Sequence, residues 1–149
     1  MKQALESLRI GDPMDPQTDV GPLARKDITD QIDQQVQRSV AAGARLVTGG
    51  KQANRQGCYY LPTLLADVKK GMAVYKEETF GPVVSIISVK DEEEAIAVAN
   101  DSEFGLGGSV WTENRERGEA VARRIETGAV FVNGLVKSDP RLPFGGIKK

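Results

Sequence analysis

The sequence contains no histidine and only one cysteine, Cys58, among its 149 residues. Without histidine, the chain cannot supply a Ser-His-Asp triad, a histidine-activated thiol or a histidine-ligated metal. A single cysteine excludes a disulfide within the chain and fits a reducing, cytoplasmic compartment. We therefore expect neither a metal site nor a self-contained catalytic triad in these residues.

Long apolar runs and an excess of one charge are also missing. No stretch reaches the roughly 20 apolar residues that a bilayer-spanning helix needs. Twenty basic and 21 acidic residues leave a net charge of −1, which gives no electrostatic basis for binding nucleic acid or an anionic membrane. The hydrophobic fraction of 40% and the charged fraction of 28% are typical of a soluble domain with a core of its own.

Hydrophobic periodicity predicts two helices in the first half of the chain. Apolar residues recur every four positions from Ile28 to Val40, which predicts an amphipathic helix that ends at Gly43. Leu5 and Leu8 indicate the last turns of an earlier helix, whose beginning is missing and which ends at Gly11.

Capping residues predict two helices in the second half. Asp91 and Glu94 have the spacing of a capping box, which places a helix over residues 92–100. Thr112 is the expected cap of the next helix, and Gly128 is its expected end.

Extended stretches alternate with these helices, which predicts the α/β class: a mostly parallel sheet with helices on both faces. Pro62 argues against a central position for the stretch 58–68. The stretch 83–89 is apolar enough to be buried on both faces of a sheet. A turn or short helix is expected over 72–78, and further strands are expected over 44–48, 107–111 and 129–133.

An acidic motif, Glu77–Pro82, stands directly before the most apolar stretch. On its own it is typical of a solvated acidic pair, followed by an aromatic residue, Phe80, that fills the core before a Gly-Pro turn. It also suits a carboxylate that accepts hydrogen bonds from a diol such as a ribose, with the phenyl ring packed beside the ligand.

Two glycine-rich segments follow. Gly105, Gly107 and Gly108 do not form a dinucleotide-binding loop, because Val110 replaces the third glycine of that fingerprint and the glycines precede a strand. The segment 133–146 follows the last predicted strand. In open α/β sheets, ligands bind outside the carboxyl ends of the strands, so this segment is a second candidate for a binding site.

Taken together and in this order, the motifs resemble the aldehyde dehydrogenase superfamily across essentially the whole chain. The loop Ser138–Phe144 is most similar to bacterial succinate-semialdehyde dehydrogenases. The resemblance implies that residues 1–149 are the C-terminal portion of the catalytic domain. The matching segments are Gly11–Pro13 with Gly21–Leu23, Glu78–Pro82, Asn100–Ser102, Gly105–Leu106, Asn133–Gly134, and Pro143–Gly146 with Lys148.

Enzymes of this family bind NAD or NADP and attack an aldehyde with a cysteine thiolate. A hydride then passes to the nicotinamide, and water hydrolyses the thioester. The resemblance implies that the nucleophile, the general-base glutamate and the dinucleotide-binding half all precede the matched segment. No catalytic residue is therefore expected in this chain, which should be inactive alone and should not bind the cofactor tightly. The implied partners are a small aldehyde and further copies of the chain in a homo-oligomer.

The resemblance also assigns roles to individual residues. Glu78 matches the glutamate that holds the nicotinamide ribose, Phe80 the aromatic residue beside it, and Leu106 an apolar contact to the nicotinamide. Phe144 matches an aromatic residue of the aldehyde pocket. Cys58 matches a segment other than the nucleophile's and has no basic neighbour that would activate it, so we expect it to serve packing.

Ser138 lies on the loop that would line the aldehyde pocket. Its hydroxyl would either bind the distal carboxylate of a semialdehyde or satisfy the backbone of its own loop. Arg141 would either add positive charge near that carboxylate or belong to the solvated surface.

A hypothesis of a different class is a stand-alone, non-catalytic oligomerisation or interaction module that keeps the inherited fold. Both predicted termini resemble interrupted elements, because the first helix lacks its start and the chain stops within a glycine-rich turn. This feature favours a portion of an enzyme over a separate module.

Overall fold

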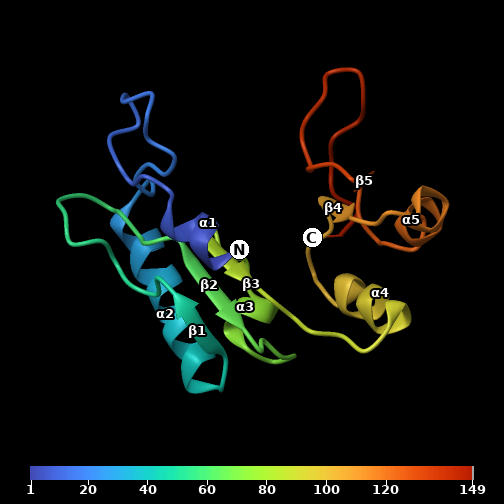
Figure 1. Cartoon of the computed structure of the whole chain (residues 1–149), viewed down its shortest axis with the longest axis horizontal. Coiled ribbons are helices and arrows are strands. Elements are labelled where there is room, and N and C mark those ends of the chain that lie inside the picture. The colour runs from blue at the N-terminus through green and yellow to red at the C-terminus, as the bar shows by residue number, and fades with distance from the viewer. Residues whose placement is uncertain (149) are drawn as a thin grey trace. The chain divides into compact units, whose positions relative to one another are not determined.

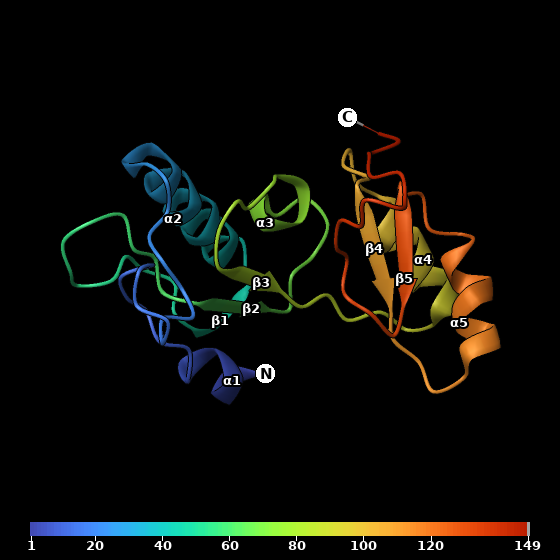
Figure 2. The ribbon, with the colours of Figure 1, turned by 90° about the horizontal axis from the view of Figure 1, so that it is seen from above.

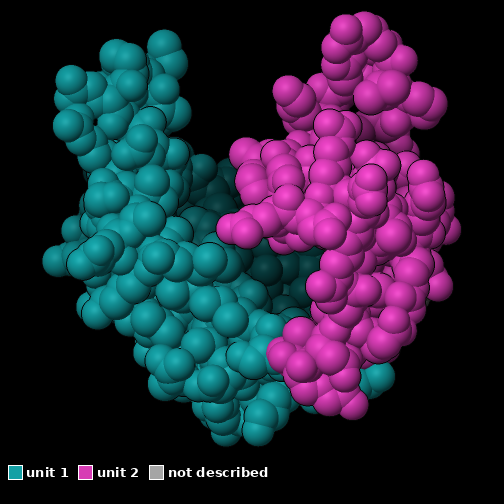
Figure 3. Space-filling view, turned by 45° about the vertical axis from the view of Figure 1, so that its right-hand side comes forward, with its two compact units in different colours: residues 1–88 teal, residues 89–149 magenta. Residues whose placement is uncertain are grey.

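The computed structural model describes residues 1–148, which fall into two units, coloured separately in Figure 3. The first unit spans Met1–Ser88 and the second Val89–Lys149. Each unit has its own sheet and its own helices, labelled in Figure 1.

The core of the first unit is built on helix α2 (Lys26–Ala41). The predicted stripe is confirmed, because Ile32 and Val36 are at most 1% exposed. The helix ends as predicted before Gly43, whose φ of 103° lies in the left-handed region. The buried hydrophobic cluster around these side chains is Ile32, Val36, Ala44, Tyr60, Leu65, Val68, Met72 and Val74.

The sheet of the first unit has the strand order β1-β2-β3, with β1 antiparallel and β3 parallel to β2. A connection without a helix joins β1 to β2, whereas α3 lies between β2 and β3 and allows a parallel crossover. Figure 2 shows α2 and α3 on one side of this sheet and α1 on the other. The bounds are β1 (Arg45–Thr48), β2 (Thr63–Ala66), β3 (Val83–Ser85), α1 (Lys2–Glu6) and α3 (Ala73–Lys76).

Two expectations about this sheet are wrong. The strand after Pro62 is central, because the proline stands one residue before β2 and its missing N–H is not needed there. The first donor of the strand, Thr63 N–H, bonds to the Pro82 carbonyl at 2.8 Å. The strand expected over 83–89 is only three residues long and is not buried on both faces, since Val84 is 37% exposed. Among the described residues it is an edge strand, so its apolar composition does not lead to burial.

The first helix also ends earlier than expected. Helix α1 stops at Glu6, and Ser7 caps it while its hydroxyl donates to the Ala4 carbonyl at 3.0 Å. Gly11 lies beyond the helix, where its N–H donates to the Val20 carbonyl at 3.1 Å. The short bridge between Ile10 and Val20 therefore takes the place of the expected last helical turn.

Within residues 89–148, the second unit contains two parallel strands and two helices, which are labelled in Figure 2. The register pairs Gly107 with Ala129 and Val110 with Val132. Helix α5 makes the crossover between the strands and packs on both. The bounds are α4 (Glu92–Asn100), β4 (Gly107–Val110), α5 (Arg115–Ala122) and β5 (Ala129–Val132).

The helix caps of this unit confirm one prediction and correct another. Asp91 caps α4 by accepting from the Glu94 N–H at 2.8 Å, and the Glu94 carboxylate reaches back to the Lys90 N–H. The cap of α5 is Asn114, which accepts from the Arg117 N–H at 2.9 Å, and not Thr112. The Thr112 hydroxyl instead accepts from the N–H of Asn114, the residue directly before the helix.

Helix α5 ends at Ala122, six residues before the expected end at Gly128. An irregular turn fills the interval and includes a bond from the Thr127 N–H to the Ile125 carbonyl. The α/β class is confirmed, with two parallel strand pairs, one antiparallel edge and helices on both faces of the first sheet. Within residues 1–148, no helix combines the length and the apolar character needed to cross a membrane.

Candidate functional site

The acidic motif forms a loop between α3 and β3, and its first carboxylate is fixed to α2. Arg38 donates to both Glu77 carboxylate oxygens at 2.9 and 2.8 Å, and the Gln35 amide donates to one of them at 3.1 Å. These hydrogen bonds, Arg38's first and then Gln35's, hold the pKa of Glu77 below its usual range. The same pair raises the pKa of Arg38. Glu77 is therefore an anchor of the loop.

The neighbouring Glu78 is arranged in the opposite way. Its backbone carbonyl accepts from the buried Gln35 amide at 3.1 Å. Its side chain is exposed, and within residues 1–148 the carboxylate has no hydrogen bond or ion pair. The loop thus holds the Glu78 backbone in place and leaves a free carboxylate available to a ligand.

Phe80 lies two residues further and does not fill the core, as one interpretation of the motif required. Its side chain is 72% exposed. It borders an apolar hollow of about 370 Å³ within the first unit. Gly81 keeps the loop close to α2, because a Cβ at this position would collide with Ile32. The hollow is lined by Pro22, Leu23, Ala24, Ile28, Thr79, Phe80 and Gly81.

In the second unit, the segment after β5 does not stay at the carboxyl ends of the strands. It runs back along β4, where Val136 leaves no room for a Cβ at Gly107. It then reaches the amino end of the strands, where the Ile147 N–H donates to the Gly105 carbonyl at 3.2 Å. The segment therefore lies at the carboxyl ends of the strands only where it begins, at Asn133, and not along its whole length.

This path brings the end of the segment beside Leu106, which is 48% exposed. A Cβ at Gly146 would lie 3.8 Å from the Leu106 Cα. A Cβ at Gly128 would collide with the Gly145 carbonyl oxygen. Phe144, which directly precedes these glycines, is 46% exposed. Leu106 and the Phe144 segment thus meet at one end of the second unit.

Several motif residues have structural roles that their sequence pattern does not indicate. Lys148 donates to the carbonyls of Asn100 and Ser102 at 2.7 and 3.1 Å. The Asn100 amide bridges the Arg124 carbonyl and the Glu126 N–H. Such half-buried side chains satisfy backbone groups of irregular segments. The signal available in the sequence was a polar side chain a few residues from a glycine.

Asn133 joins the carboxyl ends of the two strands of the second unit. Its side chain accepts from the Thr112 N–H and donates to the Thr112 carbonyl, both at 2.8 Å. Its φ of 53° lies in the left-handed region, which asparagine tolerates better than most residues. The Asn-Gly motif therefore shapes the turn after β5.

The loop 138–144 carries one charged pair and one free hydroxyl. Arg141 donates to both Asp139 carboxylate oxygens at 2.9 and 2.7 Å, and this bonding lowers the pKa of Asp139. The arrangement agrees with a surface role for Arg141. Ser138 is exposed and, among the described residues, takes part in no hydrogen bond with its loop.

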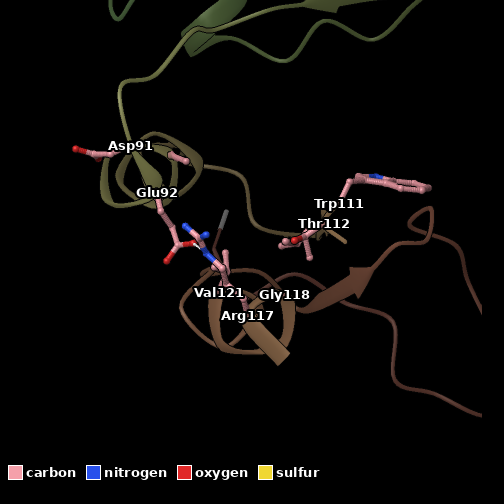
Figure 4. A pocket seen from close by; sticks show the side chains of 9 residues that line it. Asp91, Glu92, Trp111, Thr112, Arg117, Gly118 and Val121 are labelled. Carbon is pink, nitrogen blue, oxygen red and sulfur yellow. Dashed lines mark hydrogen bonds and ion pairs between the residues drawn. The ribbon is translucent and has the colours of Figure 1, made fainter. Parts of the chain in front are cut away.

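A second hollow, of about 340 Å³, lies between α4, β4 and α5 (Figure 4). Arg117 points toward Glu92 and donates to its carboxylate at 2.6 Å, which closes one side. Trp111 is 63% exposed and extends away from this ion pair. The two charges satisfy each other, so this hollow offers a ligand no free ionic partner from that pair.

Cys58 is half-buried, and its backbone carbonyl accepts from the Leu23 N–H at 2.8 Å. Within residues 1–148, no group of three or more cysteine, aspartate or glutamate side chains is arranged to hold a metal ion.

Comparison with known proteins identifies the family of this chain. The family model described as "Aldehyde dehydrogenase family" matches residues 1–149. A probable succinate-semialdehyde dehydrogenase [NADP(+)] of Synechocystis sp. is 50% identical over 149 residues, which is all of this chain and 33% of that protein. A succinate semialdehyde dehydrogenase [NAD(P)+] of Escherichia coli is 45% identical over 146 residues, 98% of this chain and 32% of that protein.

A solved structure gives the same result. The succinic semialdehyde dehydrogenase of Streptococcus pyogenes, in complex with NADP+, matches with a TM-score of 0.94 and 43% identity, over 99% of this chain and 32% of that one. The chain thus spans about a third of the length of the relatives it matches. It belongs to the aldehyde dehydrogenase family.

Proposed function

We propose that residues 1–149 form the C-terminal portion of the catalytic domain of an NAD(P)-dependent aldehyde dehydrogenase, with succinate semialdehyde as its substrate. The observation that carries the proposal is the free Glu78 carboxylate on the loop whose next residues, Thr79, Phe80 and Gly81, line an apolar hollow. A loop that offers a carboxylate, an aromatic ring and an apolar surface suits a sugar diol attached to a flat ring.

In this proposal, Glu78 accepts hydrogen bonds from the two ribose hydroxyls of the nicotinamide half of the cofactor. Hydrogen bonds to a charged group contribute about 1.5–3 kcal/mol. Phe80 packs beside that ribose, and Leu106 supplies an apolar contact to the nicotinamide. NAD(P), when bound, supplies the hydride acceptor. The contribution of these side chains is orientation, to which hydride transfer is highly sensitive.

The chain supplies no nucleophile and no general base in this proposal. Both belong to the remainder of a polypeptide of the relatives' length, as does the adenosine half of the cofactor site. Cys58, half-buried and without a histidine in the chain to activate it, does not replace the nucleophile. We therefore expect the 149-residue chain alone to be inactive, and the complete enzyme to be a cytoplasmic homo-oligomer.

The proposed substrate is supported by the names of the relatives and by the loop 138–144. The Ser138 hydroxyl is exposed and unbonded among the described residues, so it is available to a carboxylate. Phe144, half-exposed, would line the aldehyde pocket. Arg141 already binds Asp139, so Ser138 is the residue of this loop that we assign to the substrate's distal carboxylate.

The cofactor assignment is tested in a chimaera in which residues 1–149 replace the matched third of the Synechocystis relative. Glu78→Gln keeps the size of the side chain but removes its charge. We expect about a tenfold loss of NADP affinity, equal to about 1.4 kcal/mol, and slower hydride transfer. Glu113→Gln is the matched control on an exposed loop. Unchanged affinity and rate in the Glu78 variant would remove the assigned role, and a folded chimaera without activity would overturn the proposed function.

The substrate assignment is tested with Ser138→Ala in the same chimaera. The KM for succinate semialdehyde should rise about tenfold, as expected for a lost hydrogen bond to a charged group. The KM for pentanal, which is similar in length but uncharged, should change little. Ser88→Ala, at an exposed position of the first unit, is the control. Equal changes for the two aldehydes would contradict recognition of the carboxylate.

A further inference from the structure

Gln35 is a fully buried amide on α2 that is bonded to the loop carrying the candidate site. Its exposed fraction is 0%. Its Nε2 donates to the Glu77 carboxylate and to the Glu78 backbone carbonyl, both at 3.1 Å. One side chain therefore uses both of its donors on two consecutive residues that lie more than 40 positions later in the sequence.

The orientation of this amide follows from its partners. Both contacts on the loop are acceptors, so a reversed amide would place its oxygen against two other oxygens. In the observed orientation Oε1 is buried and, among residues 1–148, has no hydrogen-bond partner. An unpaired buried amide oxygen is unfavourable. An apolar side chain of similar size would avoid that cost, which points to a role for Gln35 other than stabilising the fold.

Neighbouring residues hold Gln35 itself in place. Ser39, one turn later and also fully buried, donates to the Gln35 carbonyl at 2.8 Å and accepts from the Val74 N–H at 3.0 Å. This arrangement joins α2 to α3. Arg38, between them in sequence, binds the Glu77 carboxylate. The Glu77 side chain and the Glu78 backbone are thus both fixed to helix α2, while the Glu78 carboxylate is free.

We infer that Gln35 is a positioning residue that holds the Glu78 carbonyl, and through it the Glu78 carboxylate, for cofactor orientation. The inference rests on the proposed function of Glu78. Gln35 contacts neither substrate nor cofactor in this account. Its effect is transmitted through the backbone of the loop, where small displacements of a reacting group lower the rate steeply.

Gln35→Met in the chimaera is the first test, because methionine has a similar size and removes both donors together with the unpaired oxygen. We expect about a tenfold lower rate of hydride transfer, with a larger isotope effect from the deuterated aldehyde and little change in thermal stability. Gln34→Met, at an exposed position of the same helix, is the matched control. Gln35→Leu provides a second variant if the methionine variant does not fold.

A double-mutant cycle separates positioning from a merely structural role. If Gln35 acts through Glu78, then Gln35→Met should have almost no further effect in the Glu78→Gln background. A full tenfold loss in that background, or an equal loss in Gln34→Met, would overturn the inference. So would an active Gln35→Met variant alongside an impaired Glu78→Gln variant. An unimpaired Glu78→Gln variant would instead refute the proposed role of Glu78, so the two failures are distinguishable.

Discussion

The two units of the molecule are stabilised in different ways. In the first, helix α2 and strand β2 bury large apolar side chains such as Ile32 and Leu65, which are at most 1% exposed. In the second, Ile96 is the only buried hydrophobic side chain within the described residues. That unit relies on close glycine contacts around Gly128 and on side chains such as Asn133 and Lys148 that bond to the backbone.

This difference explains why motifs have different meanings in the two units. In the first unit, an apolar core fixes the scaffold and leaves the side chains of Glu78 and Phe80 exposed. In the second unit, most polar and glycine residues of the motifs bond to the backbone or allow close packing. A motif that identifies the family thus leaves its side chains exposed in one unit and serves the fold in the other.

The largest expected effect is in the apolar unit. Ile32→Ala should lower the free energy of unfolding by about 4 kcal/mol, because it leaves a cavity beneath Gly81 in a fully buried site. Amide exchange should increase in residues 1–88 more than in 89–148. Ile147→Ala, the same class of truncation at a 64% exposed side chain, is the control. A loss of less than about 1 kcal/mol would contradict the assigned core.

A smaller effect is expected from a single added methyl group in the second unit. Gly128→Ala should cost about 2–3 kcal/mol, because the new Cβ would collide with the Gly145 carbonyl oxygen. The amides of Gly128 and Ile147, which share the Gly105 carbonyl, should lose protection in hydrogen exchange. Gly145→Ala places its Cβ in open space and should be tolerated. Equal effects of the two changes would show that glycine contacts do not hold this unit.

The smallest effect concerns pH and the Glu77 anchor. Its pKa is lower in the folded state, so below the unfolded value of about 4.3 the unfolded chain binds more protons. The stabilisation is present above that pH and is lost as the pH falls through the folded pKa. Arg38→Met should make stability depend less on pH in this acidic range, measured by urea unfolding at several pH values. Gln37→Met is the control on the same helix, and an unchanged pH dependence in Arg38→Met would remove the anchor role.

Sequence patterns predicted much of the fold but only part of the site. Local rules predict the apolar stripe of α2, the Asp91 cap and the strand at 129–133. Each of these features depends on residues that are close together in the sequence. The prediction drawn from Pro62 was wrong because a proline excludes a central strand only when its own N–H is needed for pairing. Here the first paired residue is Thr63. Gln35 was missed although it stands beside Val36 on the buried face of α2, because a polar residue within an apolar stripe gives no indication of its distant partner.

By itself, the sequence determined the order and approximate positions of the main helices and strands, and the ordered motifs of the aldehyde dehydrogenase family. Only the tertiary structure decided that Glu77 is bonded to α2 while Glu78, chemically identical and adjacent, is free. It also decided which glycines are required by close packing. Hydrogen bonding and steric exclusion act over a few ångströms in space between residues tens of positions apart, and local sequence patterns do not encode these distances.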